Sequence, residues 1–187
     1  MVAALYIDEG GPYPALLGPE RCYGLKRDAR LYTGPDPVVA HPPCGPWGKL
    51  RHLYQGSEHD CAERALAQVR ELGGILEHPA HSLLWRDHGI PRPGEMPDRW
   101  GGYSLEVCQV DFGHVARKRT WLYLVGVPRA AIKLPAPGIP THWASGSRNA
   151  PRGPVPFGIK VCSAEQRRRT PLAFARWLVA LAEHAAR

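Results

Sequence analysis

Residues 37–44, Pro37-Val38-Val39-Ala40-His41-Pro42-Pro43-Cys44, join a short apolar run to a proline-rich loop. The run predicts a buried β-strand that ends near His41. The prolines fix φ and remove backbone donors, so the loop is stiff and holds Cys44 in one place. A second stretch, Gly74-Ile75-Leu76-Glu77-His78-Pro79, predicts another short strand that ends at Glu77. The two stretches therefore predict two buried strands, each delivering one reactive side chain at its end.

The chain between and around these stretches predicts an α/β layer architecture. Helical spacing of apolar residues predicts a helix from Asp60, with Glu63 completing a capping box, to a stop at Gly73-Gly74. Ser163 with Gln166 caps a first closing helix, and Thr170 with Pro171 begins a second. Further strands are predicted over residues 2–7, 21–25, 104–110 and 120–127.

Bulk composition is that of one soluble globular domain of 187 residues, with or without a small appendage. The net charge of +7 favours a polyanion such as nucleic acid, although plain solubility explains it equally well. Five scattered cysteines without a C-x-x-C motif indicate reduced thiols and a cytoplasmic protein. No apolar run is long enough for a membrane span, and we expect a monomer by default.

The reactive residues fall where α/β sheets bind ligands, at the carboxyl ends of strands. Cys44 is a candidate nucleophile, with an inert buried thiol as the alternative interpretation. Glu77 is a candidate acid that hydrogen-bonds a base edge, with a surface carboxylate as the alternative. Arg117 and Arg119 precede the strongest predicted strand and share a face, so they can hold a base carbonyl or phosphates, or form a solvated charge run.

Taken in this order, the motifs resemble the DNA cytosine-C5 methyltransferase family. The segment 36–44 is similar to the strand and Pro-Cys nucleophile loop of that family, and Gly74–Pro79 to its strand ending in Glu-Asn-Val. The segment from Val110 through Arg117-Lys118-Arg119 to Gly126 is similar to its Gln-x-Arg-x-Arg motif and the following strand. The resemblance covers roughly residues 36–126.

The resemblance implies a Rossmann-like methyltransferase-type sheet with helices on both faces, and covalent chemistry on a pyrimidine of DNA. Cys44 would add to C6 and make C5 nucleophilic. A protonated Glu77, kept neutral in a dry site, would hydrogen-bond N3, and Arg119 with Arg117 would hold O2. The base would be flipped out of the duplex. Phosphate contacts would come from a basic set comprising Lys118, Arg148, Arg152, Arg167 and Arg168.

The resemblance implies S-adenosylmethionine as methyl donor, but the cofactor half of this chain departs from the family pattern. The counterparts of the family's binding residues are Asp8, Gly10 and Gly11 after the first strand and Asp28 after the second. The stretch before Cys44 is short, so we expect a shortened cofactor half. Three outcomes stay open: methylation with a minimal cofactor site, cofactor-independent modification or deamination, and DNA binding without catalysis by a protein that keeps the methyltransferase shape.

The domain organisation follows from the same comparison. Residues 1–127 are expected to form the methyltransferase-like catalytic core, 128–160 a Pro/Gly-rich insertion in place of a target-recognition domain, and 161–187 the helices that complete the core. Such a small basic protein suits a phage or mobile element. A zinc deaminase would need Pro-Cys-x-x-Cys, but Trp47 stands at the second cysteine position, so no metal is expected.

Overall fold

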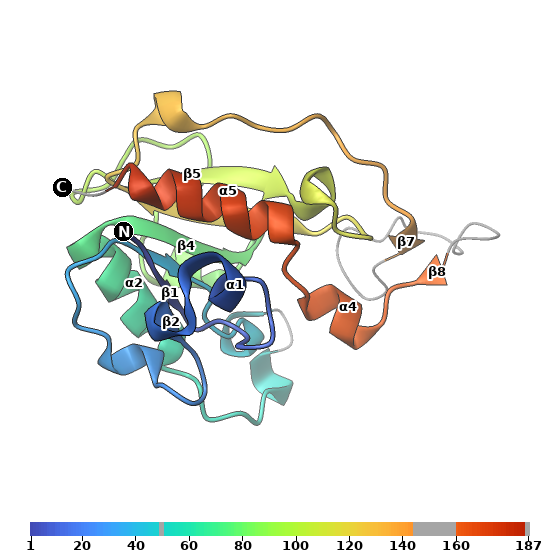
Figure 1. The fold of residues 1–187 in the computed structure, drawn as a ribbon, viewed down its shortest axis with the longest axis horizontal. Helices are drawn as coiled ribbons and strands as arrows, with labels where there is room; N and C mark the ends of the chain where they lie inside the picture. Colours follow the sequence, from blue (N-terminus) through green and yellow to red (C-terminus); the bar gives the residue numbers. More distant parts are fainter. Residues whose placement is uncertain (49–50, 144–159, 186–187) are drawn as a thin grey trace.

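The computed structural model describes residues 1–48, 51–143 and 160–185, and its centre is one twisted sheet (Figure 1). The six strands of this sheet are β1 (Ala3–Leu5), β2 (Cys22–Tyr23), β3 (Val38–Ala40), β4 (Gly74–Pro79), β5 (Tyr103–Cys108) and β6 (Arg119–Val125). The helices are α1 (Tyr13–Leu17), α2 (Cys61–Leu72), α3 (Leu83–Asp87), α4 (Ala164–Arg168) and α5 (Leu172–Glu183). The predicted α/β class is thus confirmed.

Strand order in the sheet is β2-β1-β3-β4-β6-β5. The first four strands are parallel, and β6 runs antiparallel to both β4 and β5. The chain leaves β1 toward β2 on one side and returns to β3 on the other, so the order reverses between β1 and β3. In open α/β sheets ligands bind outside the carboxyl ends of the strands at such a switch point. The loop that carries Cys44 leaves β3 at this position.

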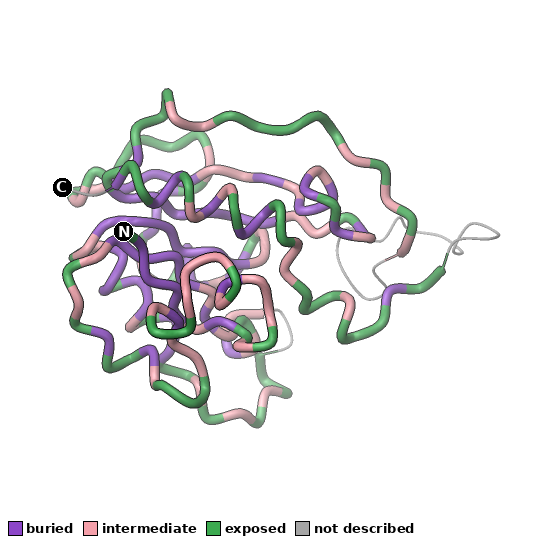
Figure 2. The backbone as a smooth tube through the Cα atoms, viewed as in Figure 1, coloured by how far each residue is buried: buried purple, intermediate pink, exposed green. Residues whose placement is uncertain are grey.

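Helices cover both faces of the sheet, as the sequence predicts. One apolar core lies between the sheet and helices α1 and α5, where Tyr13 and Phe174 are buried. The other core lies under α2 and α3 and contains Leu66 and Trp85. Strands β1 and β3 are buried at every residue, and β4 at every residue except Pro79, which explains their apolar runs in the sequence (Figure 2).

Helix starts differ from the prediction at two of three positions. Ser163 and Gln166 do form the predicted capping box of α4. Asp60 precedes α2 but its side chain does not cap the helix, because the carboxylate accepts from the Arg30 guanidinium at 3.1 Å instead. Helix α5 begins at Leu172 with Pro171 as the N-cap residue, one position later than the Thr170 cap predicted.

The segment after β6 crosses the molecule without forming a further layer. Residues 128–141 contain one short 3-10 turn, Arg129–Ala131, and lead to β7 (His142–Trp143), which pairs in parallel with β8 (Lys160–Val161). In Figure 1 this orange segment passes above β5 toward β7, and α4 follows β8. Within the described residues, no helix is both long and apolar enough to cross a membrane.

Candidate functional site at the carboxyl ends of β3 and β4

Cys44 lies on an ordered turn at the surface, directly after β3. The His41 backbone N–H donates to Leu5 O at 3.0 Å, which extends the pairing of β3 with β1 by one residue. Cys44 then precedes the 3-10 turn Gly45–Trp47, and its carbonyl accepts from the Trp47 N–H at 3.1 Å. Cys44 is exposed, whereas Cys22, Cys61 and Cys162 are buried. The proline loop therefore places Cys44 at the surface, at the switch point.

Glu77 lies inside β4 and not after it. Strand β4 continues along its antiparallel partner β6 after its pairing with the parallel strand β3 has ended. Pairing with β3 ends at Leu76, opposite Ala40, while pairing with β6 continues to Pro79. Glu77 is thus the first residue of β4 beyond the end of β3, and its side chain points to the same face as Ile75, toward α1 and α5. Only 8% of the residue is exposed.

Both carboxylate oxygens of Glu77 accept hydrogen bonds. His41 Nδ1 lies 2.9 Å from Oε2, and Gln109 Nε2 donates to Oε1 at 3.1 Å. The other ring nitrogen of His41 bonds the hydroxyl of buried Tyr13. Burial, with the charge of Glu77, raises the pKa of Tyr13, so its phenol keeps the proton and can donate to His41 Nε2. That tautomer leaves Nδ1 as the N–H that donates to Glu77.

The carboxyl of Glu77 is ionised in this environment. Burial alone would raise its pKa, but the hydrogen bond from His41 and the nearby positive charge of Lys118 outweigh burial and lower the pKa to about 2. The expectation of a neutral Glu77 is therefore wrong for the free protein. Glu77 is ionised because His41, just after β3, and Gln109, just after β5, donate hydrogen bonds to it. The sequence around Glu77 does not reveal these distant donors.

Cys44 and Glu77 are close enough for their charges to interact. Removal of water around the sulfur and the negative charge of Glu77 raise the pKa of the Cys44 thiol, and Lys118 and Arg168 act in the opposite direction. The same Lys118 lowers the pKa of Glu77. Four charged or ionisable groups from four separate segments thus gather at one end of the sheet.

Lys118, and not its neighbours Arg117 and Arg119, is the basic residue on this side of the sheet. Arg119 binds Glu106 through Nε at 2.7 Å and through Nη2 at 2.6 Å, beside Trp121. Arg117 is exposed. Alternation along β6 places Lys118 with Thr120 and Leu122 on the Glu77 side. The alternation of side chains along the strand predicted over 120–127, extended back to residue 118, could have placed Lys118 on this face from the sequence alone.

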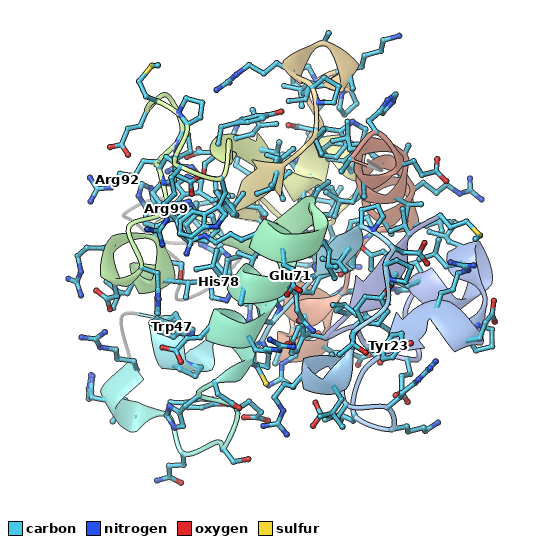
Figure 3. All side chains as sticks on the ribbon, turned by 90° about the vertical axis from the view of Figure 1, so that its left-hand side faces the viewer. Tyr23, Trp47, Glu71, His78, Arg92 and Arg99 are labelled. Atoms are coloured by element: carbon cyan, nitrogen blue, oxygen red, sulfur yellow. The ribbon has the colours of Figure 1, made fainter. Side chains whose placement is uncertain are left out.

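Two buried polar atoms have no hydrogen-bond partner among the described residues, Trp47 Nε1 and Gln109 Oε1. His78 Nε2 lies against the carbonyls of Pro43 and Pro42. Trp47 ends the turn after Cys44, His78 follows Glu77, and Gln109 donates to Glu77 (Trp47 and His78 are labelled in Figure 3). Unpaired buried polar atoms are rare in native proteins and call for an explanation such as a ligand or catalytic role. Gln109 adjoins Glu77, whereas Trp47 and His78 pack on the opposite face with the core under α2 and α3, so only the unpaired Gln109 oxygen lies beside the carboxylate.

Backbone strain marks the same end of the sheet. Tyr6, after β1, has φ 57°, and His81, after β4, has φ 63°. Positive φ is uncommon for residues with a side chain, costs about 1–3 kcal/mol, and clusters at functional sites. No other described residue except glycine has positive φ.

The four residues expected to bind S-adenosylmethionine are engaged in holding the local backbone. Asp8 accepts from Gly10 N at 3.0 Å, and its carbonyl accepts from Gly11 N at 2.9 Å, which makes a closed turn. The carboxylate of Asp28 accepts three bonds from Arg30, from the backbone N–H, Nε and Nη2. The Asp28 carboxylate is therefore occupied by Arg30.

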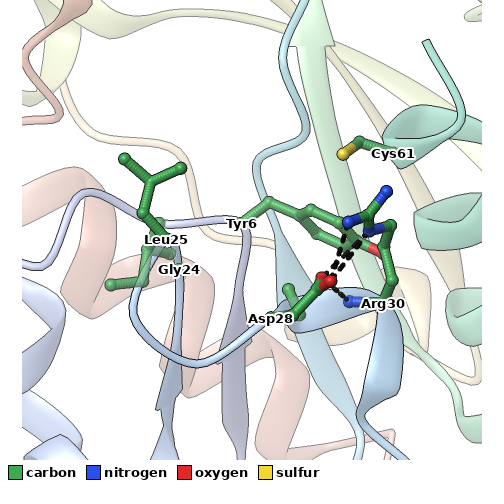
Figure 4. A pocket seen from close by; sticks show the side chains of 8 residues that line it. Tyr6, Gly24, Leu25, Asp28, Arg30 and Cys61 are labelled. Atoms are coloured by element: carbon green, nitrogen blue, oxygen red, sulfur yellow. Dashed lines mark hydrogen bonds and ion pairs between the residues drawn. The ribbon is translucent and has the colours of Figure 1, made fainter. Parts of the chain in front are cut away.

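A hollow of about 200 Å³ lies beside Asp28, lined by Tyr6, Gly24, Arg30 and Cys61 among others (Figure 4). Small-molecule pockets usually measure about 300–1,000 Å³. The hollow is smaller than that range, and the Arg30 guanidinium covers the carboxylate that would select a ribose. These residues, as they are arranged, do not fit S-adenosylmethionine.

Of the basic residues expected to contact DNA, Lys118 and Arg168 lie near Cys44. Arg168 on α4 is exposed and acts on the Cys44 thiol, and Arg167 is exposed beside it. Helix α4 is held near the site by His114, whose Nε2 bonds the Gln166 carbonyl at 3.0 Å. Arg148 and Arg152 lie outside the described residues.

In the described parts of the chain, no group of three or more His, Cys, Asp or Glu side chains could hold a metal ion.

Comparison with known proteins identifies no family. No protein-family model matches the chain, and no curated protein matches it significantly. The functional interpretation therefore rests on the residues and their geometry.

Proposed function

We propose that this chain is a DNA-modifying enzyme that adds Cys44 to C6 of a pyrimidine base, in the manner of a cytosine-C5 methyltransferase. The observation that carries the proposal is the pairing of a surface cysteine with a buried, hydrogen-bonded carboxylate at the switch point of the sheet. The sheet is compatible with a Rossmann-like fold, and its assignment to the methyltransferase type is part of the proposal.

The chemistry uses Cys44 as a transient covalent catalyst. The thiolate sulfur bonds to C6, and the electron pair of the C5–C6 double bond moves toward the ring carbonyl or N3, which makes C5 nucleophilic. C5 takes an electrophile, the original C5 proton leaves, and the S–C6 bond breaks to restore the double bond. A base must leave the stack to meet a thiol held on a protein loop, so the substrate is single-stranded or flipped.

Charge around the site supports a nucleic-acid partner. Lys118 and Arg168 both act on the Cys44 thiol, and Arg167 and Arg168 are exposed on α4. Phosphates held by these residues would place a neighbouring base over the sulfur. The net charge of +7 adds long-range attraction to DNA.

The transferred group is not assigned, because the predicted donor residues do not fit S-adenosylmethionine. A proton from solvent is the simplest electrophile, and it makes the proposal testable without a cofactor. In D2O the Cys44 adduct takes a deuteron at C5, loses the original proton and collapses. The expected result is exchange of the C5 hydrogen of a pyrimidine, measured by mass spectrometry of nucleosides from a digested oligonucleotide.

Two serine variants make the exchange experiment specific. Cys44→Ser should abolish exchange, while Cys108→Ser, which removes a partly exposed thiol at the end of β5, should leave it unchanged. Exchange that survives in Cys44→Ser, or no exchange with any pyrimidine, would overturn the proposal.

A non-catalytic DNA-binding role is the second candidate, favoured by the raised pKa of Cys44. A thiol that stays protonated in the free protein is a weak nucleophile. On this alternative, wild type and Cys44→Ser bind an oligonucleotide with equal affinity, and neither exchanges its C5 hydrogens.

A further inference from the structure

The hydrogen-bond directions at Glu77 carry a conclusion about which pyrimidine the site accepts. Oε2 accepts a hydrogen bond from His41 Nδ1, and Oε1 accepts one from the Gln109 amide nitrogen. The Gln109 amide nitrogen also donates to Thr120 Oγ1 at 3.1 Å, which fixes the orientation of the amide. Every described partner of the carboxylate is thus a donor, and the carboxylate is held as an acceptor.

The donor on the His41 side is held from behind by a second buried group. Tyr13 is 2% exposed, and its hydroxyl donates to His41 Nε2, which leaves the ring hydrogen on Nδ1, facing Glu77. Protonation of Glu77 would require either loss of the Gln109 hydrogen bond or a change of the His41 tautomer with reversal of the Tyr13 hydrogen bond. An acceptor-only carboxylate can receive a hydrogen bond from a base edge but cannot donate one.

The ring nitrogen N3 distinguishes the pyrimidines at this edge. In uracil N3 carries a hydrogen and is a donor, whereas in neutral cytosine N3 is an acceptor. Glu77, as an acceptor, can bind the N3–H of uracil. Against cytosine, the lone pairs of Glu77 and N3 would repel each other. We propose that the site selects a pyrimidine with an N3–H, as in a 2′-deoxyuridine residue, over cytosine; this rests on the proposed Cys44 chemistry.

The basic residue at the site suits the same substrate. Addition of the thiolate to C6 of uracil moves the C5–C6 electron pair into an enolate whose negative charge resides on O4. Lys118, which acts on both Cys44 and Glu77, offers a positive charge to that oxygen. Cytosine would instead need a proton at N3, for which this carboxylate is the wrong partner.

The test compares C5 exchange in two single-stranded oligodeoxynucleotides that are identical except at one position, dU in one and dC in the other. All other positions are dA or dT, since thymine carries a methyl group at C5 and has no hydrogen to exchange. Each rate in D2O is divided by the rate with dithiothreitol alone, which removes the intrinsic difference between the rings. We expect the normalised rate to be at least about 10-fold higher for dU, the factor for about 1.4 kcal/mol.

The outcomes separate the two proposals. Exchange of dC at an equal or higher normalised rate would overturn the inference and leave the Cys44 chemistry standing. Absence of exchange in both oligonucleotides would overturn the Cys44 chemistry itself.

A pair of variants ties the preference to Glu77. In Glu77→Gln the side-chain amide can donate to cytosine N3 as well as accept from N3–H, so the preference should collapse to about 1. Glu106→Gln is the matched control, because Glu106 binds Arg119 on the other side of the sheet and should keep the wild-type ratio. A Glu77→Gln protein that is folded and keeps the preference would contradict the role of Glu77. If that variant does not fold, the wild-type ratio still decides.

Discussion

His41 and Glu77 extend from neighbouring parallel strands and meet just beyond the last residue pair of those strands, with His41 Nδ1 2.9 Å from Glu77 Oε2. The Tyr13 hydroxyl supports the far side of the ring. This chain of three side chains connects α1, β3 and β4 and keeps a buried carboxylate charged.

Removal of His41 should be costly for folding. His41→Leu leaves the ionised Glu77 buried without its main donor, and loss of a hydrogen bond to a buried charged group costs about 1.5–3 kcal/mol. Urea unfolding at pH 7 measures the loss. Tyr13→Phe, which removes only the outer hydrogen bond, should cost about 1 kcal/mol. Equal losses in the two variants would contradict the idea that the charge of Glu77 dominates.

Two substitutions should shift Cys44 reactivity in opposite directions. Glu77→Gln removes a negative charge that raises the thiol pKa, so alkylation by iodoacetamide at pH 8 should accelerate several-fold. Lys118→Met removes a positive charge that lowers it, so alkylation should slow. The rate is followed by mass spectrometry of the Cys44 peptide. Changes in the same direction would show that access, and not charge, controls the thiol.

The sequence predicts the strands that carry Cys44 and Glu77 because central parallel strands are buried on both faces and leave a continuous apolar signature. The order of residues then locates the reactive groups at strand ends. Tyr13 could not be predicted in the same way, since its approach to His41 depends on how the short helix α1 folds back over the sheet.

Side-chain partners limited the rest of the prediction. Asp60 has the sequence of a helix cap, yet Arg30, thirty residues earlier, binds it. Arg119 has the sequence of a base-binding residue, yet Glu106 on the adjacent strand binds it. Tertiary packing decides whether a side chain binds a local or a distant partner. The sequence around a residue does not show which distant residue will be close to it in the fold.

Gly74 should be irreplaceable at the start of β4. Its φ is +111°, and a Cβ there would overlap the backbone of Val38 on β3. Gly74→Ala should cost more than about 3 kcal/mol or prevent folding, because strain and overlap add. Gly89, with φ +58° and open space around it, provides the control, and Gly89→Ala should cost about 1 kcal/mol in the same urea titration.

Two acid-unfolding windows should be separable. Burial lowers the pKa of His78 from 6.5 to about 4, so below pH 6.5 the unfolded chain takes up the proton first. Stability is therefore complete above pH 6.5 and falls by about 3 kcal/mol as the pH drops through 4. The pKa of Glu77 is lowered from 4.5 to about 2, so its contribution is lost in the lower window, between pH 4.5 and 2.

His78→Asn isolates the upper window, since asparagine is neutral at every pH of the titration. The variant should lose the dependence between pH 6.5 and 4 while keeping the one below it, as measured by urea midpoints across the pH series. An unchanged upper window would assign that titration to another histidine.

Arg168 should contribute a phosphate contact if DNA reaches Cys44 from the side of α4. Arg168→Ala then weakens binding to a single-stranded oligonucleotide and lowers the slope of log K against log salt by about 0.7, the value for one phosphate contact. Arg129 is the control, because its guanidinium stacks 4.0 Å from the Tyr103 ring after the end of antiparallel β6, at the opposite end of the sheet. Arg129→Ala should leave the slope unchanged.

A slope that falls equally for both variants would mean that DNA is attracted by overall charge, and a slope that falls for neither would place the DNA strand away from α4. Fluorescence anisotropy between 50 and 200 mM salt gives both slopes, and Cys44→Ser protein keeps the measurement free of covalent adducts.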